Sequence, residues 1–393
     1  MRLGAGISGR NRSMHKEDKM TKEKPLEKKL EKLTEEKSAE EKLTEGKNAV
    51  SVDIVIPVYC PGEKFLRLMQ MLAKQTHPIG KIILMNTEER LWTPEAERVC
   101  RETVSSENAV SSVELHHLSK EDFDHAATRR AGIRHSNAAF FICMTDDAVP
   151  ADEFLVERLL DSFSETAAGA EETYGEKQLE ADRESGRNAV VAEVYARQLP
   201  TEACGEAEQF TRLFNYPETS FVKSKANLPG LGIKTYFASN VCCAYRRAVY
   251  DRLGGFCGSA VFNEDMIFAS KAIQAGYLIA YRADARVLHA HRYTALQQLR
   301  RNFDLGMSQA MHPEVFSGLK SEGEGIRLVK ATAAHLLQTG HAAALPGLFW
   351  QSACKYLGFR LGRAYRRIPY GVCLWLAMNR IYLQKHRTEL WGK

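Results

Sequence analysis

From Val52 onward, the sequence alternates short apolar runs with stretches of helical periodicity, and this alternation is the strongest constraint on its fold. Short runs rich in branched and aromatic residues are typical of buried strands, and apolar residues at every third or fourth position indicate helices. We predict strands at 52–57, 81–85 and 138–144, and helices at 64–75 and 124–136. Strands that alternate with helices indicate β-α-β units around a largely parallel sheet, the half-fold that binds nucleotides.

The second half of the chain continues this pattern and then becomes helical. Strands are predicted at 189–196 and 236–245. A helix over Met266–Ala275 is predicted to end at Gly276, because glycine tolerates the left-handed conformation at a helix end. The polar, acidic stretch 164–187 is predicted to be a surface insertion, and the pattern beyond about Met311 is mostly helical.

Residues 1–48 have a different composition, dominated by Lys and Glu. Such a segment buries too little apolar surface to offset its ordering entropy, although it could form a lone charged helix. We therefore expect a disordered arm here.

Composition narrows the class of protein. The 393 residues are 44% hydrophobic and 26% charged, which is ordinary for a globular enzyme. The nine cysteines show no paired metal spacing and are expected to be reduced. The sequence has no secretory signal pattern and no apolar run of membrane-spanning length, so a cytoplasmic protein is expected. A net charge of +5 is too small to indicate nucleic-acid binding.

Positive charge is concentrated at the C-terminus. Residues 354–393 hold nine Lys or Arg against one acid, Glu389, and these basic residues are interleaved with aromatic ones. The longest apolar stretch, 370–378, has nine residues and falls short of the roughly 20 that a membrane-spanning helix requires. We predict either that this tail lies on an anionic membrane surface or that its aromatic face packs on the catalytic core.

Two acidic sites stand where chemistry is expected. Asp146 and Asp147 follow the predicted strand 138–144, and ligand sites in α/β sheets lie just beyond the carboxyl ends of strands. Paired acids there indicate a metal ion that holds phosphate oxygens, and the alternatives are a surface turn or a helix N-cap. Glu264 and Asp265 come directly before the predicted helix at Met266, where a carboxylate can also be only a cap.

Four short motifs follow one another along the chain. They are Val55-Ile56-Pro57-Val58-Tyr59, Ala127-Thr128-Arg129-Arg130-Ala131-Gly132, Thr145-Asp146-Asp147, and Gly254-Gly255-Phe256 followed by Glu264-Asp265. In this order and spacing they resemble the family 2 glycosyltransferases, nucleotide-sugar enzymes of the GT-A type. Shorter strings resemble the rhamnosyltransferase-like members: Phe123-Asp124-His125, 195–200, 214–217 and Ser239-Asn240-Val241-Cys242.

The resemblance implies a GT-A fold, a Rossmann-like mixed sheet flanked by helices, over residues 49–310, with a basic, aromatic helical extension at 311–393. It implies inverting, metal-dependent transfer of one sugar, with dTDP-rhamnose as the first-ranked donor, to a hydroxyl of a cell-surface glycan or lipid-linked acceptor. A single addition is expected because Gln297-Gln298-Leu299-Arg300-Arg301 lacks the tryptophan of the processive synthases. The alternative is a catalytically silent nucleotide-sugar sensor or scaffold at the membrane surface.

On the donor side, the resemblance assigns the metal to one acid of the pair. Asp147 matches the second acid of the family's Asp-x-Asp motif, Asp146 matches its variable middle position, and Thr145 replaces its first acid. Of the alternating His289 and His291, which share one face if they lie on a strand, His291 is favoured as a further ligand of Mg²⁺ or Mn²⁺. The other residues expected to bind the donor are Pro57, Tyr59, Asn86, Arg129 and Asp146.

On the acceptor side, Asp265 matches the family's general base, which accepts the proton of the acceptor hydroxyl. Glu264 is expected to orient the helix start or to help seat the acceptor. The predicted location is the cytoplasm, with peripheral binding to the inner face of the plasma membrane through the basic tail.

Overall fold

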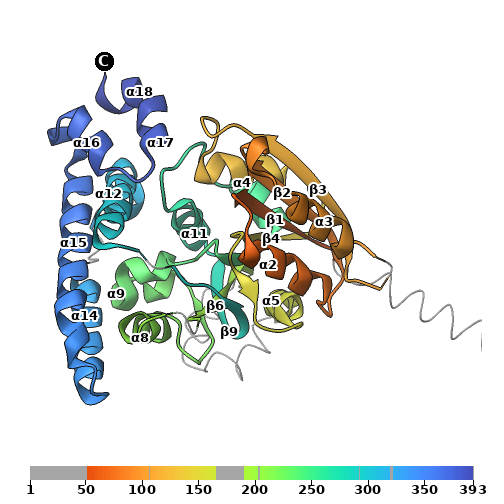
Figure 1. The fold of residues 1–393 in the computed structure, drawn as a ribbon, viewed down its shortest axis with the longest axis horizontal. Coiled ribbons are helices and arrows are strands. Elements are labelled where there is room, and N and C mark those ends of the chain that lie inside the picture. Colours follow the sequence, from red (N-terminus) through yellow and green to blue (C-terminus); the bar gives the residue numbers. More distant parts are fainter. Residues whose placement is uncertain are drawn as a thin grey trace, which may run out of the picture. The chain divides into compact units, whose positions relative to one another are not determined.

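The computed structural model describes residues 51–105, 107–164, 190–201, 204–291, 293–318 and 322–392. The predicted arm (1–48) and all but the first residue of the predicted insertion (164–187) lie outside the described residues. The described part is a mixed sheet with helices on both faces, followed by a helical C-terminal region (Figure 1). This arrangement confirms the predicted α/β class and the helical extension.

Four parallel strands form the first half of the sheet. They are β1 (Val52–Tyr59), β2 (Ile79–Thr87), β3 (Val110–Leu118) and β4 (Phe140–Met144). Their order is β3-β2-β1-β4, with Val58 of β1 beside Asn86 of β2 and Val55 of β1 beside Cys143 of β4. The three strands predicted in this half correspond to β1, β2 and β4.

An antiparallel strand joins the second half to the first. The strands of this half are β5 (Val149–Pro150), β6 (Val191–Leu199), β7 (Phe221–Lys223), β8 (Cys242–Arg246) and β9 (Leu278–Leu288). β8 is antiparallel to both β4 and β6, and β6 is parallel to β9, so β6 and β9 run in the same direction as β1–β4. The carboxyl ends of these six strands therefore meet at one edge of the sheet, next to the start of β8.

Helices cover both faces of the sheet because side chains of each strand alternate between the faces. Ile54 and Ile56 of β1 pack in the core beneath α2 (Glu63–Ala73), α3 (Pro94–Thr103) and α5 (Leu155–Ser164). Val55 faces the opposite core, which contains residues of α4 (His125–Ile133), α10 (Arg247–Arg252) and α11 (Glu264–Gln274). The remaining short elements of this part are η1 (Glu89–Leu91), α8 (Glu206–Asn215), η2 (Lys225–Asn227), α9 (Leu228–Leu231) and η3 (Gly232–Tyr236).

The structure corrects two sequence-based assignments. The strand predicted at 236–245 forms only at Cys242–Arg246, because the chain before it makes η3 and a loop. The stretch after Asp147 does not open a helix: Val149–Pro150 form β5, and α5 begins at Leu155. The N-cap alternative for Asp147 is therefore wrong.

The C-terminal region consists of helices that follow the last strand of the sheet. They are α12 (Ala295–Met311), α13 (Pro313–Phe316), α14 (Glu322–Gln338), η4 (Ala342–Ala344), α15 (Leu345–Arg363), η5 (Tyr365–Arg367), α16 (Tyr370–Leu376), α17 (Arg380–Lys385) and α18 (Arg387–Trp391). α12 crosses the predicted domain boundary at residue 310, and the chain from Ser51 onward packs as one compact unit. Among the described residues, no helix has the length and apolar character needed to cross a membrane.

One face of the tail packs on α12. Val261, which precedes the C-terminal region, and Phe303 of α12 share a hydrophobic core with Tyr365, Cys373 and Leu383 of the tail. The predicted packing of the tail on the catalytic part thus occurs through this face.

Glycines bring the backbones of α12 and α15 into direct contact (Figure 1). A Cβ atom on Gly358 of α15 would overlap the carbonyl oxygen of Leu299, and one on Gly362 would overlap that of Phe303. Because the obstacle is backbone rather than a movable side chain, these positions admit no side chain without displacing a helix.

Substitution of Gly362 by Ala should therefore destabilise the fold, although alanine is the better helix former by about 1 kcal/mol. Overpacking of this kind costs about 1–3 kcal/mol, and we expect Gly362→Ala to lower the melting temperature. Gly347→Ala, in the same helix but with no atom within 4 Å of the added Cβ, should leave it unchanged or raise it slightly. Equal melting temperatures of the two variants would contradict the packing described here.

Candidate active site

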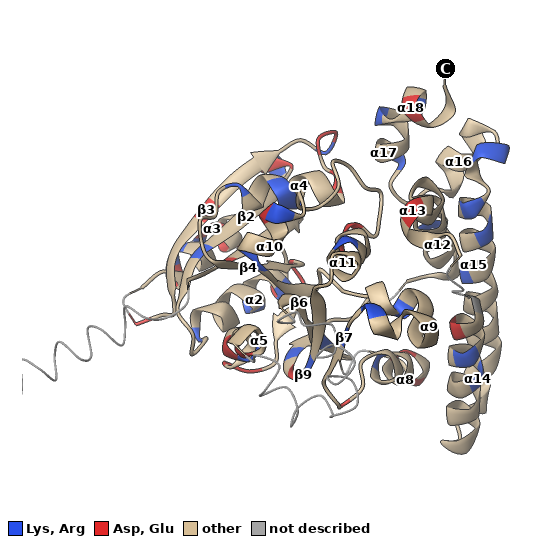
Figure 2. Cartoon of the chain, turned by 180° about the vertical axis from the view of Figure 1, so that it is seen from behind, with Lys and Arg blue, Asp and Glu red and all other residues tan. Residues whose placement is uncertain are grey.

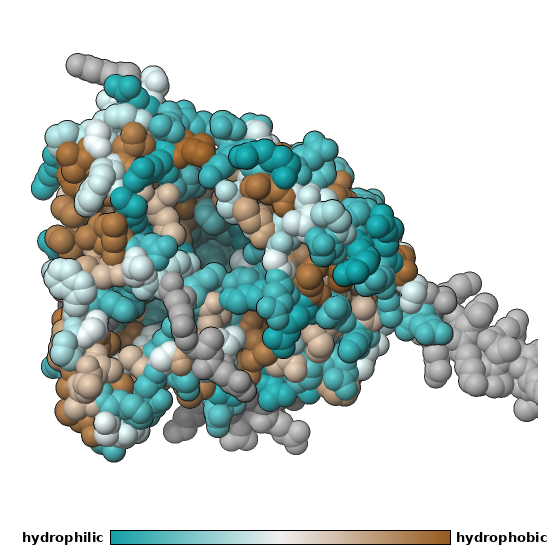
Figure 3. Space-filling model, in the orientation of Figure 1, coloured by the Kyte–Doolittle hydropathy of each residue, from teal (hydrophilic) through white to brown (hydrophobic). Residues whose placement is uncertain are grey.

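The shared edge of the strands opens into a cavity of about 2000 Å³. The surface view shows a hollow with hydrophilic residues at its visible floor (Figure 3). Its walls come from the loops after β1, β4, β6 and β9, from the start of α11, and from α8, α12 and α15. Both acidic sites predicted from the sequence line this one cavity.

Asp146 fixes the loop after β1. Its Oδ2 accepts a hydrogen bond from the backbone N–H of Tyr59 at 3.0 Å. Burial raises the pKa of Asp146 to about 6, although this hydrogen bond opposes the rise. The Tyr59 side chain is exposed, and its hydroxyl accepts a hydrogen bond from Lys120 at 3.3 Å.

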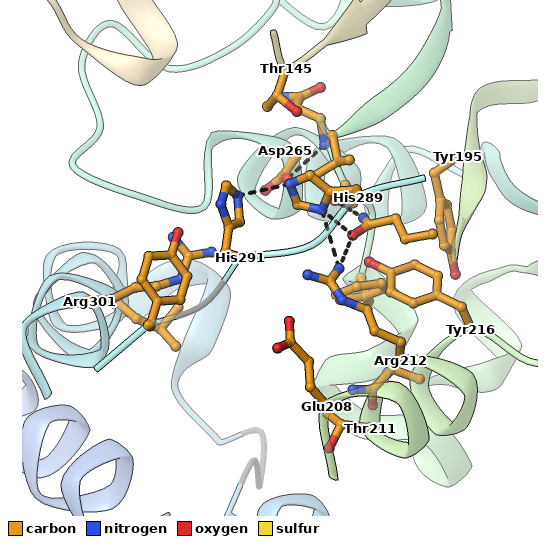
Figure 4. Close-up of a pocket in the computed structure, with 18 of the residues that line it drawn as sticks. Thr145, Tyr195, Glu208, Thr211, Arg212, Tyr216, Asp265, His289, His291 and Arg301 are labelled. Atoms are coloured by element: carbon orange, nitrogen blue, oxygen red, sulfur yellow. Dashed lines mark hydrogen bonds between the residues drawn. The ribbon is translucent and has the colours of Figure 1, made fainter. Parts of the chain in front are cut away.

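Asp147 forms a cluster with two histidines that follow β9. Its Oδ1 lies 3.5 Å from His289 Nε2 and its Oδ2 lies 3.4 Å from His291 Nε2. The two Nε2 atoms are 3.0 Å apart (Figure 4). The histidines lie just beyond the strand rather than on it, yet both approach Asp147, and His289 is the member of the cluster that the sequence did not favour.

The cluster has the spacing and the chemistry of a metal site. Bonds of about 2.0–2.2 Å to a central ion place neighbouring donor atoms roughly 2.8–3.6 Å apart, for octahedral or tetrahedral geometry. All three distances in the cluster fall in this range. Burial lowers the pKa of His289 and of His291, which favours the neutral imidazole that binds metals. The residues present therefore fit a divalent cation.

Lys64 adds a cation to this cluster. It stands in the first turn of α2, where its Nζ lies 3.6 Å from Asp147 Oδ2 and donates to the carbonyl of Ala290 at 2.9 Å. Lys64 thereby ties the histidine loop to the loop after β4.

The second acidic site is built around a buried ion pair. Arg129 of α4 lies 3.1 Å from Glu264 at the start of α11, and their side chains are 5% and 7% exposed. Asn240 donates to the same Glu264 oxygen at 3.0 Å and accepts from Tyr245 at 2.7 Å. Burial alone would raise the pKa of Glu264, but the charge of Arg129 and these neighbours lower it, so the carboxylate is ionised.

Backbone hydrogen bonds hold Asp265, the residue next to this pair. Asp265 Oδ2 accepts from the backbone N–H of Asn240 at 3.1 Å, and Oδ1 accepts from that of Met266 at 2.8 Å. Asn263 precedes the helix in the left-handed conformation, with φ of 65°. Burial and the adjacent Glu264 charge raise the pKa of Asp265 to about 7. Its carboxyl group can therefore exchange a proton near neutral pH.

Hydrogen bonds connect the two acidic sites. Ser239, next to Asn240, accepts from Gln198 Nε2 at 2.9 Å, and Gln198 Oε1 lies 3.1 Å from His289 Nδ1. A proton on Nδ1 would bond this oxygen and leave Nε2 free to bind a metal. Gln198 and Ser239 belong to two of the strings that resemble rhamnosyltransferases, but neither was predicted as a site residue.

Some of the other residues predicted to bind the donor line the cavity, and two lie outside its lining. Asn86 is fully buried, with Nδ2 2.9 Å from His117 Nδ1, and its Oδ1 has no hydrogen-bond partner in the described part of the chain. Pro57 lies within β1. Neither Asn86 nor Pro57 is among the described residues that line the cavity. The predicted residues that line it are Tyr59, Arg129, Asp146, Asp147, Glu264, Asp265 and His291.

Sequence comparison finds relatives along most of the chain. The O-antigen chain rhamnosyltransferase RfbN of Salmonella typhimurium is 31% identical over 337 residues, which cover 85% of this chain and 96% of the relative. The chain belongs to the rhamnosyltransferase-like family 2 glycosyltransferases of the GT-A type. A second relative of this glycosyltransferase is the O-antigen chain rhamnosyltransferase WbaN of Salmonella anatum, 30% identical over 337 residues, or 84% of this chain and 95% of the relative.

Other comparisons with this glycosyltransferase are more distant. No protein-family model matches it. Among solved structures, the mannosyltransferase PcManGT of Pyrobaculum calidifontis, in complex with GDP-Man and Mn²⁺, is 13% identical over 87% of each chain, with a TM-score of 0.44. TarS 1-349 of S. aureus, in complex with UDP-GlcNAc, is 15% identical over 81% of this chain and 92% of that chain, with a TM-score of 0.42.

Proposed function

We propose that this glycosyltransferase transfers one rhamnosyl group from dTDP-rhamnose to a hydroxyl of an O-antigen-type cell-surface glycan, with inversion at the anomeric carbon. The names of the two relatives support the sugar and the acceptor class. The observation that carries the mechanism is the presence, in one cavity, of a metal-type cluster and a separate buried carboxyl whose pKa is about 7. A silent sensor would need no such carboxyl.

Asp147, His289 and His291 would hold the divalent cation. When bound, the ion supplies positive charge to the diphosphate leaving group. Two imidazoles favour Mn²⁺ over Mg²⁺, because imidazole suits transition metals and Mg²⁺ prefers oxygen ligands. Lys64 and the neighbouring Asp146 then fix the two loops that enclose the diphosphate.

Asp265 is the general base in this proposal. Its backbone hydrogen bonds orient the carboxylate and oppose the rise of its pKa, while Glu264, paired with Arg129, holds the helix start and raises the pKa of Asp265 toward neutral pH. The acceptor hydroxyl loses its proton to Asp265 as its oxygen bonds the anomeric carbon. Arg129 thus supports the base side, and a direct contact with the donor is not part of the proposal.

We also propose that the tail binds an anionic membrane surface, which would bring the enzyme to a lipid-linked acceptor. The face of α15 opposite its glycines exposes Phe349, Trp350 (65% exposed) and Tyr356, and α16 exposes Trp375 (55%). Hydrophobic residues gather along the edge of the molecule that the C-terminal helices form (Figure 3), and basic residues recur on the half of α15 next to α16 (Figure 2). Aromatic and basic side chains together are typical of interfacial helices. The cytoplasmic location remains a prediction.

The proposed reaction is tested by incubating the protein with dTDP-rhamnose, UDP- and GDP-sugars and measuring nucleoside-diphosphate release with Mn²⁺, Mg²⁺ or chelator. We expect release from dTDP-rhamnose with Mn²⁺ and loss of release with chelator, because the leaving diphosphate needs charge neutralisation. Release that is insensitive to chelator would remove the metal role of Asp147, His289 and His291.

Replacement of the base should abolish transfer without loss of donor binding. We expect Asp265→Asn to lower kcat by about 10²–10⁴-fold and to leave the Kd of the donor unchanged. In the unmodified enzyme, kcat should rise with pH through about 7, since only the unprotonated carboxylate of Asp265 accepts a proton. Asp251→Asn, an exposed aspartate of α10, is the control. Unchanged turnover in Asp265→Asn would refute the assignment.

Membrane binding is tested by co-sedimentation with vesicles that contain phosphatidylglycerol. The double variant Trp350→Ser/Trp375→Ser should bind at least tenfold more weakly, because two large apolar side chains no longer enter the interface. Phe154→Ser, an exposed aromatic of the catalytic part, should bind like the unmodified protein. Equal binding of the double variant would end the membrane proposal.

A further inference from the structure

Helix α8 brings an arginine, Arg212, to the metal-type cluster. None of the residues of α8 is buried, and the helix is held to α14 by Glu206, whose carboxylate lies 2.8 Å from His335, and by stacking of Phe210 on the same histidine at 4.4 Å. From α8 the Arg212 side chain extends into the cavity toward His289 (Figure 4).

Arg212 makes only neutral polar contacts there. Its Nη1 donates to Gln198 Oε1 at 2.5 Å and lies 3.3 Å from His289 Nδ1. Within the described part of the chain, no carboxylate forms an ion pair with Arg212. Since guanidinium groups in cavities normally pair with carboxylates or phosphates, the contacts seen here leave room for an anionic ligand.

Positive charge exceeds negative charge around the cluster, which favours binding of an anion. Arg212 lies 3.3 Å from His289 and Lys64 lies 3.6 Å from Asp147, and the charges of Lys64, Arg212 and Arg301 each act to lower the pKa of His289 and of His291. Asp147 is the one carboxylate that forms ion pairs with Lys64, His289 or His291 among the described residues, and a bound divalent cation would add two further positive charges. A ligand with several negative charges would balance this excess.

Arg212 differs from Arg301, another arginine that lines the cavity. The Arg301 guanidinium lies over the ring of Phe262 at 4.6 Å and near that of Tyr293 at 5.6 Å, so aromatic faces occupy it. Arg212 has a hydrogen-bonding amide on one side and the open cavity on the other. Its planar fork suits the paired oxygens of a phosphate.

We propose that Arg212 binds the diphosphate of the nucleotide-sugar donor and stabilises the charge that develops on its leaving phosphate. In the transfer, the acceptor oxygen forms a bond to the anomeric carbon as the bond from that carbon to the phosphate oxygen breaks. The bonding electron pair goes to the phosphate oxygen, and the acceptor proton goes to Asp265. Arg212 and Lys64 then flank the diphosphate from α8 and α2. This inference rests on the proposed nucleotide-sugar reaction.

The test measures nucleotide affinity and turnover in Arg212→Met, which removes the charge and keeps an extended side chain. We expect the Kd of dTDP to rise roughly 10- to 100-fold, the effect of losing a charged hydrogen bond, with little change in the Kd of thymidine. kcat should fall at least as much, and Arg212→Lys should recover part of both losses. Arg327→Met removes another cavity arginine, one already paired with Glu324 at 3.2 Å, and should bind dTDP normally.

The outcomes separate this inference from the proposed function. If the unmodified protein binds dTDP and Arg212→Met binds it equally well, Arg212 does not contact the diphosphate, even if kcat falls through a disturbed His289. If Arg212→Met weakens dTDP and thymidine alike, the arginine supports the fold of the site and the inference is wrong. If the unmodified protein binds neither dTDP nor dTDP-rhamnose, the proposed donor itself is wrong. Melting temperatures of all variants verify that they are folded.

Discussion

The buried ion pair between Arg129 and Glu264 is the interaction on which the site depends. Each charge would be strongly unfavourable alone in the interior, and loss of one partner of such a pair typically costs about 3–5 kcal/mol. The pair joins α4, which connects β3 to β4 in the parallel half of the sheet, to α11, which lies between the antiparallel strand β8 and β9. Asn240, at the start of β8, bonds the same carboxylate, so three elements meet at the residue next to Asp265.

This arrangement relates the two halves of the site rigidly. Asn240 holds both Glu264 and Asp265, and its neighbour Ser239 accepts from Gln198, which lies against His289. A displacement of α11 would therefore also displace residues of the metal-type cluster. Direct displacement requires that the donor and the base lie at a fixed distance from each other. This short hydrogen-bonded path would hold the donor side and the base side of the site at that distance.

The fold and the two acids were predictable from the sequence because their signals are local. The runs that became β1, β2 and β4 are apolar and short, and Asp147 and Asp265 stand at a strand end and a helix start. Gln198 and Arg212 were not found, because their meeting with His289 depends on how β6, β9 and α8 assemble. The packing role of the glycines of α15 could likewise not be predicted, since it depends on the contact of these glycines with α12.

The central claim is that one base and one leaving group act on opposite faces of the sugar. The measurement that tests it most directly is the configuration of the new glycosidic bond, determined by NMR of the product made from an anomerically pure donor. A single displacement assisted by Asp265 predicts a product with the anomeric configuration opposite to that of the donor. A product that retains the donor's configuration would contradict the account, because a single displacement from the face opposite the leaving group can only invert the anomeric carbon.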